Sequence, residues 1–158
     1  MRIGVISDTH GDVEATQQAV RILDSLDVSL TIHCGDVGSE VLPALEGRRV
    51  HFVHGNMDAS DPLDEWLIDP NHTYHHHFGS IELEGRRIAF LHGHDVKLLH
   101  DTIHSGQWDL VCHGHTHAYA SSREGRTVVL NPGALSRTRC PSLAVVGLPS
   151  LDVTPLSL

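Results

Sequence analysis

The chain has 158 residues and a formal net charge of −9, with 40% hydrophobic and 20% charged residues. These values are typical of one soluble domain, residues 1–158, with a buried core. The negative charge argues against a basic groove for long nucleic acid, and no apolar stretch approaches the roughly 20 residues that span a bilayer. Three cysteines without CxxC spacing and the absence of signal-peptide features predict a cytoplasmic protein.

The first half of the chain alternates predicted strands with predicted helices. Apolar residues recur at helical spacing after Asp12, a suitable N-cap, and a strand pattern lies on either side of this helix. This order predicts a β-α-β unit with parallel strands. Residues 59–72 are rich in Asp, Pro and Asn and predict an irregular connection. The predicted strands cover 2–7, 28–34 and 50–54, and the predicted helices cover 13–26 and, more weakly because of Pro43, 39–46.

The second half is richer in predicted strands. The tract Tyr74-His75-His76-His77 is assigned to a solvated strand, in which neighbouring imidazoles face opposite sides. A helix is expected to begin after Asp95 and to end at Gly106. Alternating elements followed by strands predict an α/β fold with two packed sheets and helices outside. The predicted strands are 74–78, 81–84, 87–91, 110–113, 118–122, 127–130, 143–148 and 151–153.

Five of the predicted strands stop at a short cluster of Asp, Asn, Gly and His. In α/β sheets, ligands bind at the carboxyl ends of the strands, so we expect the five clusters to form one site. The glycines permit the tight turns that such an arrangement needs. The clusters are Asp8-Thr9-His10, Gly35-Asp36, Gly55-Asn56-Met57-Asp58, His92-Gly93-His94 and Gly114-His115-Thr116-His117.

The clusters contain more candidate ligands than one tetrahedral metal ion accepts. They suit two ions that share a carboxylate, which could be Asp36 or Asp8. Mixed oxygen and nitrogen donors favour Mn, Fe, Zn, Ni or Co over Mg or Ca, with manganese first. Two ions about 3.5–4 Å apart can clamp phosphate oxygens and place a hydroxide for in-line attack on phosphorus. The candidate ligands are Asp8, His10, Asp36, Asn56, His92, His115 and His117.

The five clusters, in this order, resemble the motifs of the calcineurin-like metallophosphoesterase superfamily, most closely its small uncapped bacterial and archaeal phosphodiesterases. The resemblance implies a two-sheet sandwich flanked by helices. It also implies a dinuclear phosphodiesterase that hydrolyses a small phosphoester by attack of a metal-bridging hydroxide. One implied ion is held by Asp8, His10, Asp36 and His117, and the other by Asn56, His92, His115 and the bridging Asp36.

The chain departs from this family pattern at the proton donor. Met57 stands where many superfamily members carry a histidine that acts as general acid. A good leaving group needs no acid, so this difference favours activated or diester substrates. His94 is the candidate for a proton donor. Arg137 and Arg139 follow an Asn-Pro-Gly turn and are candidates for phosphate contact. The catalytic set is therefore Asp8, Asp36, Asn56 and His94.

Two other functions are compatible with this fold. A eukaryotic retromer subunit resembles it but has lost ligand histidines, so a metal-binding or vestigial-site interaction scaffold is the alternative. A nuclease is disfavoured by the acidic charge and by the lack of a cap domain. Self-association into a homo-oligomer is left open. Other polar or thiol side chains near the clusters are expected to support the site without binding metal, namely Asp58, His33, His54, His113, Cys34 and Cys112.

Overall fold

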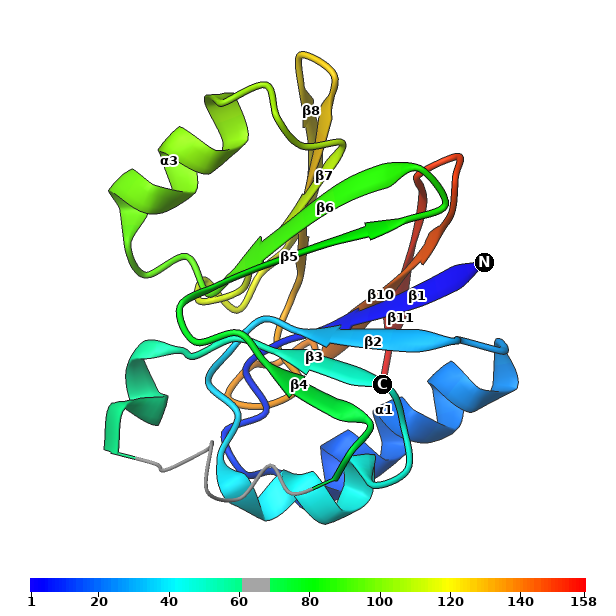
Figure 1. Cartoon of the computed structure of the whole chain (residues 1–158). Coiled ribbons are helices and arrows are strands. Elements are labelled where there is room, and N and C mark those ends of the chain that lie inside the picture. The colour runs from blue at the N-terminus through cyan, green and yellow to red at the C-terminus, as the bar shows by residue number, and fades with distance from the viewer. Residues whose placement is uncertain (61–68) are drawn as a thin grey trace.

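The computed structural model describes residues 1–60 and 69–158, which form two mixed β-sheets with helices on their outer faces (Figure 1). This arrangement confirms the predicted α/β class with two packed sheets. The strand order is β11-β10-β1-β2-β3-β4 in the first sheet and β5-β6-β7-β9-β8 in the second. The first sheet contains β1 (Arg2–Ile6), β2 (Leu30–His33), β3 (Val50–Phe52), β4 (His72–Tyr74), β10 (Ser142–Gly147) and β11 (Asp152–Ser157). The second contains β5 (Phe78–Leu83), β6 (Arg86–Leu91), β7 (Leu110–Cys112), β8 (Tyr119–Glu124) and β9 (Thr127–Pro132).

Strand direction brings the five clusters to one region of the molecule. Strands β1 to β4 pair in parallel in the first sheet, and β6, β7 and β9 pair in parallel in the second. Strands β10 and β11 and the edge strands β5 and β8 pair antiparallel. Because parallel strands end on the same side, the segments after β1, β2 and β3 meet at one edge, and those after β6 and β7 meet at another.

The core has three apolar layers, one between the sheets and one under each group of helices. Ile3, Ile32 and Phe90 belong to the layer between the sheets. Helix α1 (Val13–Ser25) and the 3₁₀ helix η1 (Ser39–Leu45) pack on the first sheet, and α3 (Val96–His104) packs on the second. A second 3₁₀ helix, η2, covers Asn56–Ser60. Among the described residues, no helix is both long and apolar enough to cross a membrane.

The predicted helix starts are confirmed by their caps. The Asp12 side chain accepts a hydrogen bond from the Ala15 amide at 3.0 Å, and Asp95 accepts one from the Leu98 amide at 2.9 Å. These contacts satisfy amides that a helix leaves unpaired in its first turn. The weakly predicted helix over 39–46 forms as the short 3₁₀ helix η1, with Pro43 inside it.

The prediction of a strand over 74–78 was wrong. Strand β4 ends at Tyr74 beside β3, whereas β5 begins at Phe78 beside β6, so residues 75–77 carry the chain from one sheet to the other. His76 adopts a left-handed conformation with φ 56°, which interrupts an extended strand. The strand predicted over 81–84 is the end of β5, which starts earlier. Most of the connection predicted over 59–72 falls on 61–68, outside the described residues.

Candidate metal centre

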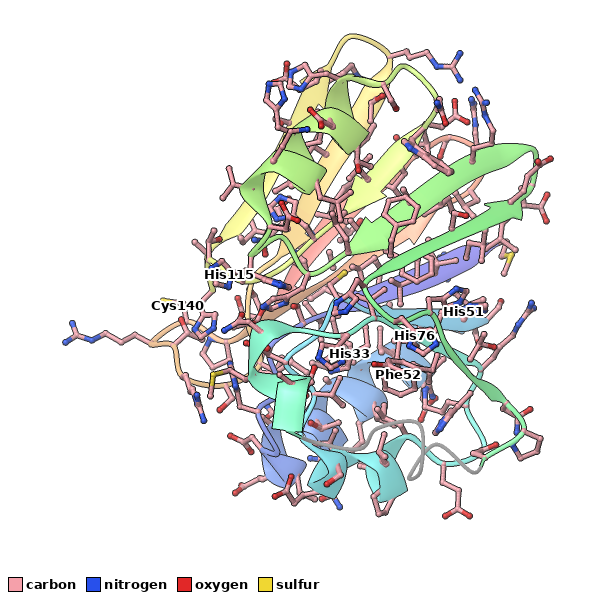
Figure 2. The ribbon with its side chains drawn as sticks, turned by 60° about the vertical axis from the view of Figure 1, so that its left-hand side comes forward. His33, His51, Phe52, His76, His115 and Cys140 are labelled. Atoms are coloured by element: carbon pink, nitrogen blue, oxygen red, sulfur yellow. The ribbon has the colours of Figure 1, made fainter. Side chains whose placement is uncertain are left out.

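All seven predicted ligands lie on the segments that follow β1, β2, β3, β6 and β7. The packing of the two sheets brings these segments together. Figure 2 shows His115 toward the outside of this region and His33 further inside the molecule. His33 is fully buried, whereas His115 is exposed. The structure therefore assembles the predicted donors into one centre that is open on one side.

One group of donors surrounds the buried side chain of Asp8. Asp8 Oδ1 lies 3.2 Å from His117 Nε2 and 3.7 Å from His10 Nε2, and the two imidazole nitrogens are 3.4 Å apart. Asp8 Oδ1 is buried and has no hydrogen-bond partner among the described residues. A buried carboxylate oxygen without a partner is costly. Oxygen and imidazole donors at these separations fit a divalent cation.

The second group of donors meets at Asp36 and His92. Asp36 Oδ2 lies 3.3 Å from His92 Nε2 and 3.8 Å from His10 Nε2. His92 Nε2 is also 3.0 Å from Asn56 Oδ1, and the His115 ring lies 5.1 Å from the His92 ring, centroid to centroid. One oxygen of Asp36 thus faces imidazoles of both groups.

The protein orients the central side chains through their remaining atoms. Asp8 Oδ2 accepts hydrogen bonds from Ser7 Oγ at 2.6 Å and from the His115 amide at 3.1 Å. Asp36 Oδ1 accepts one from the Met57 amide at 2.8 Å. The Cys34 carbonyl lies 2.8 Å from His92 Nδ1 and accepts its proton, which leaves the Nε2 lone pair directed at the centre.

Charge interactions keep Asp36 ionised. Burial alone would raise its pKa, but the contact with His92 and the hydrogen bond from the Met57 amide outweigh burial and lower the pKa to about 2. The same contact acts on the imidazole. Burial would lower the pKa of His92, but the neighbouring Asp36 carboxylate raises it. A carboxylate that stays ionised in this way provides an anionic ligand at neutral pH.

The backbone at five of the predicted ligands is left-handed. Their φ angles lie between 46° and 70°, a region that few non-glycine residues adopt. Each such residue costs of the order of 1 kcal/mol or more, and residues of this kind cluster at functional sites. The residues are Asp8, His10, Asp36, His115 and His117. The sequence did not predict this feature because aspartate and histidine, although enriched among left-handed residues, adopt that geometry too rarely for the residue type alone to indicate it.

Two motif glycines are required because other groups approach them closely. A Cβ at Gly55 would overlap the backbone and the carboxylate of Asp36, and a Cβ at Gly114 would overlap the Ser7 hydroxyl. A side chain at Gly55 would displace the Asp36 carboxylate, and a side chain at Gly114 would displace Ser7, which orients the Asp8 carboxylate. The glycines in these motifs therefore fix the distance between loops as well as permitting turns.

Asp58 and Asn131 hold the loops in place. Asp58 is buried, and its carboxylate accepts hydrogen bonds from the Val37 and Gly55 amides, each at 2.9 Å. It thus joins the segment after β2 to the segment after β3, in the supporting role predicted for it. Asn131 Nδ2 donates to the Gly114 carbonyl and to Thr116 Oγ1, each at 2.9 Å. The sequence marked Asn131 only as part of a turn, and did not predict its contact with the Gly114 loop.

The nearby histidines and cysteines also support the fold. His33 Nε2 donates to Thr9 Oγ1 at 2.9 Å, its Nδ1 accepts from the Gly35 amide at 3.2 Å, and burial lowers its pKa to about 3. His54 Nδ1 is hydrogen-bonded to the Tyr74 hydroxyl at 2.7 Å. Burial raises the pKa of the Cys34 and Cys112 thiols, as expected for small packed side chains. His113 is half-buried beside the Gly114 carbonyl, and burial lowers its pKa.

An open pocket of about 340 Å³ adjoins the centre, with His10, Asp36, Met57 and Arg137 in its walls. Burial lowers the pKa of His10. The positive charge of the Arg137 guanidinium lowers this pKa further, because it disfavours a second positive charge on the imidazole. Arg139 is exposed and does not line this pocket. The other predicted catalytic residue, His94, is exposed, and its ring lies 5.5 Å from that of His92 and 6.3 Å from that of His115.

Known proteins share this sequence pattern over most of the chain. Residues 1–151 match the family model of the calcineurin-like phosphoesterase superfamily domain. Phosphodiesterase MJ0936 of Methanocaldococcus jannaschii is 34% identical over 138 residues, which cover 84% of this chain and 83% of that protein. The probable metallophosphoesterase YsnB of Bacillus subtilis is 33% identical over 148 residues, which cover 88% of this chain and 78% of that protein.

Solved structures share the fold as well. An archaeal phosphodiesterase superposes with a TM-score of 0.91 at 30% identity, and the match covers 100% of both chains. A Vps29 variant from Entamoeba histolytica superposes with a TM-score of 0.72 at 19% identity, covering 100% of this chain and 99% of that one. The second likeness concerns the fold alone.

Proposed function

The chain belongs to the calcineurin-like phosphoesterase superfamily and is a phosphoesterase, and we propose that it hydrolyses small phosphodiesters with two divalent cations at the centre described above. The observation that carries the proposal is the position of Asp36. Its Oδ2 lies 3.8 Å from His10 Nε2 in one donor group and 3.3 Å from His92 Nε2 in the other. A single carboxylate placed in this way is suited to bind two cations at once.

We assign the donors to two cations that share Asp36. The unpartnered, buried Asp8 Oδ1 supports a cation beside His10 and His117. The mixed oxygen and nitrogen donors support manganese first, with Fe, Zn, Ni or Co also suitable. When bound, such ions would acidify water and neutralise phosphate oxygens. The first cation would be held by Asp8, His10, Asp36 and His117, and the second by Asp36, Asn56, His92 and His115.

Residues at the rim would act on the substrate itself. The Arg137 guanidinium, which lines the adjoining pocket, is placed to donate to phosphate oxygens that carry negative charge. Met57 is 54% exposed at the same pocket and cannot donate a proton to a leaving group. The pocket is therefore better suited to diesters with good leaving groups than to alkyl monoesters.

The metal proposal is tested by measuring metal content and hydrolysis of bis-p-nitrophenyl phosphate together. The wild-type chain is expected to bind two equivalents of Mn. Asp36→Asn should bind fewer and should lose at least the roughly 10²–10³-fold of kcat that removal of one stabilising group costs. Asp101→Asn, the same chemical change on the exposed face of α3, should leave both quantities unchanged. Full activity in Asp36→Asn would contradict the proposal.

We propose His94 as the proton donor, since its ring lies beside those of His92 and His115 on the exposed side of the centre. General acid catalysis contributes about 10²–10⁴-fold, and only for poor leaving groups. His94→Gln should therefore slow hydrolysis of a diester with an alkoxide leaving group while changing the p-nitrophenyl diester little. An equal loss with both substrates would show that His94 acts through the metal centre and does not protonate the leaving group.

The alternative function is an interaction scaffold in which the metal site is vestigial. The fold shared with Vps29 makes this alternative compatible with the structure but does not favour it. All seven candidate ligands are present here, and the backbone of five of them keeps the left-handed geometry described above. A chain that binds no metal and hydrolyses no phosphoester would favour the scaffold. The cytoplasmic location stays a prediction from the sequence.

A further inference from the structure

A second pocket, of about 550 Å³, lies at the ends of β6 and β7 that are remote from the metal centre. Its walls come from the β5–β6, β8–β9 and β10–β11 turns, from the ends of β6 and β8 beside them and from the residue that precedes β7. Figure 1 shows the β5–β6 and β10–β11 turns on the same side of the molecule, and a hydrogen bond of 2.7 Å from Arg86 Nε to the Pro149 carbonyl joins them. The polar lining residues are Arg86, Arg87, Asp109, Arg123, Arg126 and Ser150.

The charge of this pocket is opposite to that of the whole chain. The chain carries a net charge of −9 and has only 11 Lys and Arg residues. Four of these arginines line the pocket, and Asp109 is the one acidic residue in its lining within the described part of the chain. Glu84 and Glu124 belong to the adjacent turns but do not line it. The pocket therefore concentrates positive charge that its own lining does not neutralise.

Asp109 holds the arginines in a fixed arrangement. Its Oδ1 accepts a hydrogen bond from Arg126 Nη2 at 3.1 Å and lies 3.7 Å from Arg86 Nη1. Its Oδ2 accepts from the Arg87 amide at 2.9 Å. The Asp109 side chain is only 12% exposed, whereas the side chains of Arg86 and Arg126 are 38% and 57% exposed. A buried carboxylate thus keeps two guanidinium groups together that would otherwise repel each other.

Most guanidinium donors in the pocket are left over for a ligand. Each arginine has five N–H groups, and Asp109 together with the Pro149 carbonyl occupies only a few of those on Arg86 and Arg126. Guanidinium groups match phosphate oxygens in pairs of parallel hydrogen bonds. One phosphate group would not balance the uncompensated charge, whereas two linked phosphates would.

We propose that this pocket binds a compact polyphosphate anion, such as pyrophosphate or the polyphosphate arm of a nucleotide, separately from the metal centre. None of the lining residues is a candidate metal ligand, so the site does not depend on the proposed hydrolysis. The anchored arginines lose little freedom when the ligand binds, which favours affinity.

The test is isothermal titration of pyrophosphate into the metal-loaded, full-length protein. Arg86→Gln/Arg126→Gln removes the two arginines that Asp109 holds. Arg87→Gln/Arg123→Gln removes the other two guanidinium groups and leaves the side-chain contacts of Asp109 in place. Arg87 binds Asp109 through its backbone amide, and the Arg123 guanidinium donates to the Arg126 carbonyl instead. Arg21→Gln/Arg49→Gln is the matched control, because it removes the same charge from positions outside the pocket. Thermal unfolding of each variant checks that it is folded.

Both pocket variants are expected to weaken pyrophosphate binding at least about tenfold, the loss of one charged hydrogen bond or more. The control should bind within about twofold of wild type, and orthophosphate should bind wild type more weakly than pyrophosphate. The proposal is overturned if wild type binds no pyrophosphate, or if all three variants lose affinity equally. It is also overturned if binding survives in the pocket variants and disappears in Asp36→Asn, because the anion would then bind only at the metal centre.

Discussion

The two ends of strands β6 and β7 carry sites of opposite character. At the carboxyl ends, carboxylates and imidazoles gather around Asp36 in a geometry suited to cations. At the amino ends, four arginines surround Asp109 in a pocket suited to anions. The net charge of −9 describes neither end. The contrast shows that the overall charge of a small domain does not reveal how that charge is divided between its surfaces.

The region around the candidate metal ligands (the metal end) and the region around the arginine pocket (the arginine end) also differ in how closely their backbones pack. Glycines at the metal end, Gly55 and Gly114, lie where a Cβ would overlap a neighbouring residue. Glycines at the arginine end, Gly85 and Gly125, have left-handed φ angles of 71° and 59°, but a Cβ there would meet no atom of the described residues within 4 Å. The metal end therefore depends on close contact between loops, whereas the arginine end depends only on turns and on side chains.

Substituting a glycine at each end gives the largest expected difference. In Gly55→Ala, the added methyl group would overlap Asp36, so we expect a loss of about 1–3 kcal/mol in stability. Displacement of a charge-stabilising carboxylate should reduce kcat/KM about 100-fold or more. Gly125→Ala should cost about 1–2 kcal/mol from backbone strain alone and leave hydrolysis unchanged. Urea unfolding and kcat/KM for both variants measure the contrast, and equal activity losses would refute it.

That the candidate ligands lie together could be predicted from the sequence, because they directly follow strands whose order was recognised. Parallel strands end at one edge, so motifs at residues 8, 36 and 56 had to meet once β1, β2 and β3 were recognised. The arginine pocket left no such signal. Arg86 begins β6, Asp109 precedes β7 and Arg126 precedes β9, so the three residues are distant in the sequence and belong to no repeated motif. The parallel pairing of β6 with β7 and of β7 with β9 brings the starts of these strands together, but scattered arginines there do not indicate a site as the clusters of Asp, Asn, Gly and His do.

The crossover between the sheets could not be predicted for a related reason. Residues 74–78 alternate as a strand does, but their conformation depends on which sheet offers a partner. Tyr74 pairs with Phe52 in one sheet and Phe78 with Leu91 in the other. His75 Nε2 is hydrogen-bonded to His51 Nδ1 at 2.7 Å, a contact that holds the crossover against the first sheet. Local periodicity cannot report such competition between partners.

Acid is expected to lower the free energy of unfolding through His33. Near neutral pH, this loss is smaller than the loss caused by Gly55→Ala. The pKa of His33 is about 3 in the folded chain and its ordinary value is 6.5, so the unfolded chain binds the additional proton between these values. Stability is complete above pH 6.5 and falls as the pH decreases toward 3, by up to about 1.4 kcal/mol per pH unit. His33→Asn should be less stable at pH 7 but should lose less stability on acidification.

The His33 prediction is measured by urea unfolding between pH 7 and pH 4 in the presence of a chelator, which removes the separate effect of metal release. His100→Asn is the matched control, because that imidazole is exposed on α3. Its substitution should leave the pH dependence of the wild type intact. If His33→Asn keeps the full acid sensitivity, the buried imidazole is not its source.

The smallest expected effect concerns communication between the two ends. Strand β6 has six residues, and at about 3.3 Å per residue it separates the sites by roughly 20 Å. This distance is about 2.5 times the Debye length of about 8 Å at physiological ionic strength, so the charge of the arginines is largely screened at the candidate metal centre. Arg86→Gln/Arg126→Gln should therefore change kcat/KM for bis-p-nitrophenyl phosphate by less than about twofold at about 0.15 M salt.

Low salt sharpens this last test, because screening weakens while the structure stays the same. At about 0.01 M ionic strength the Debye length is about 30 Å, so the loss of two positive charges should slightly reduce the rate for an anionic substrate. A large effect that persists at high salt could not be electrostatic. It would require the strands themselves to transmit a change from Asp109 to His92, through β7 and β6, and the two ends would then form one coupled system.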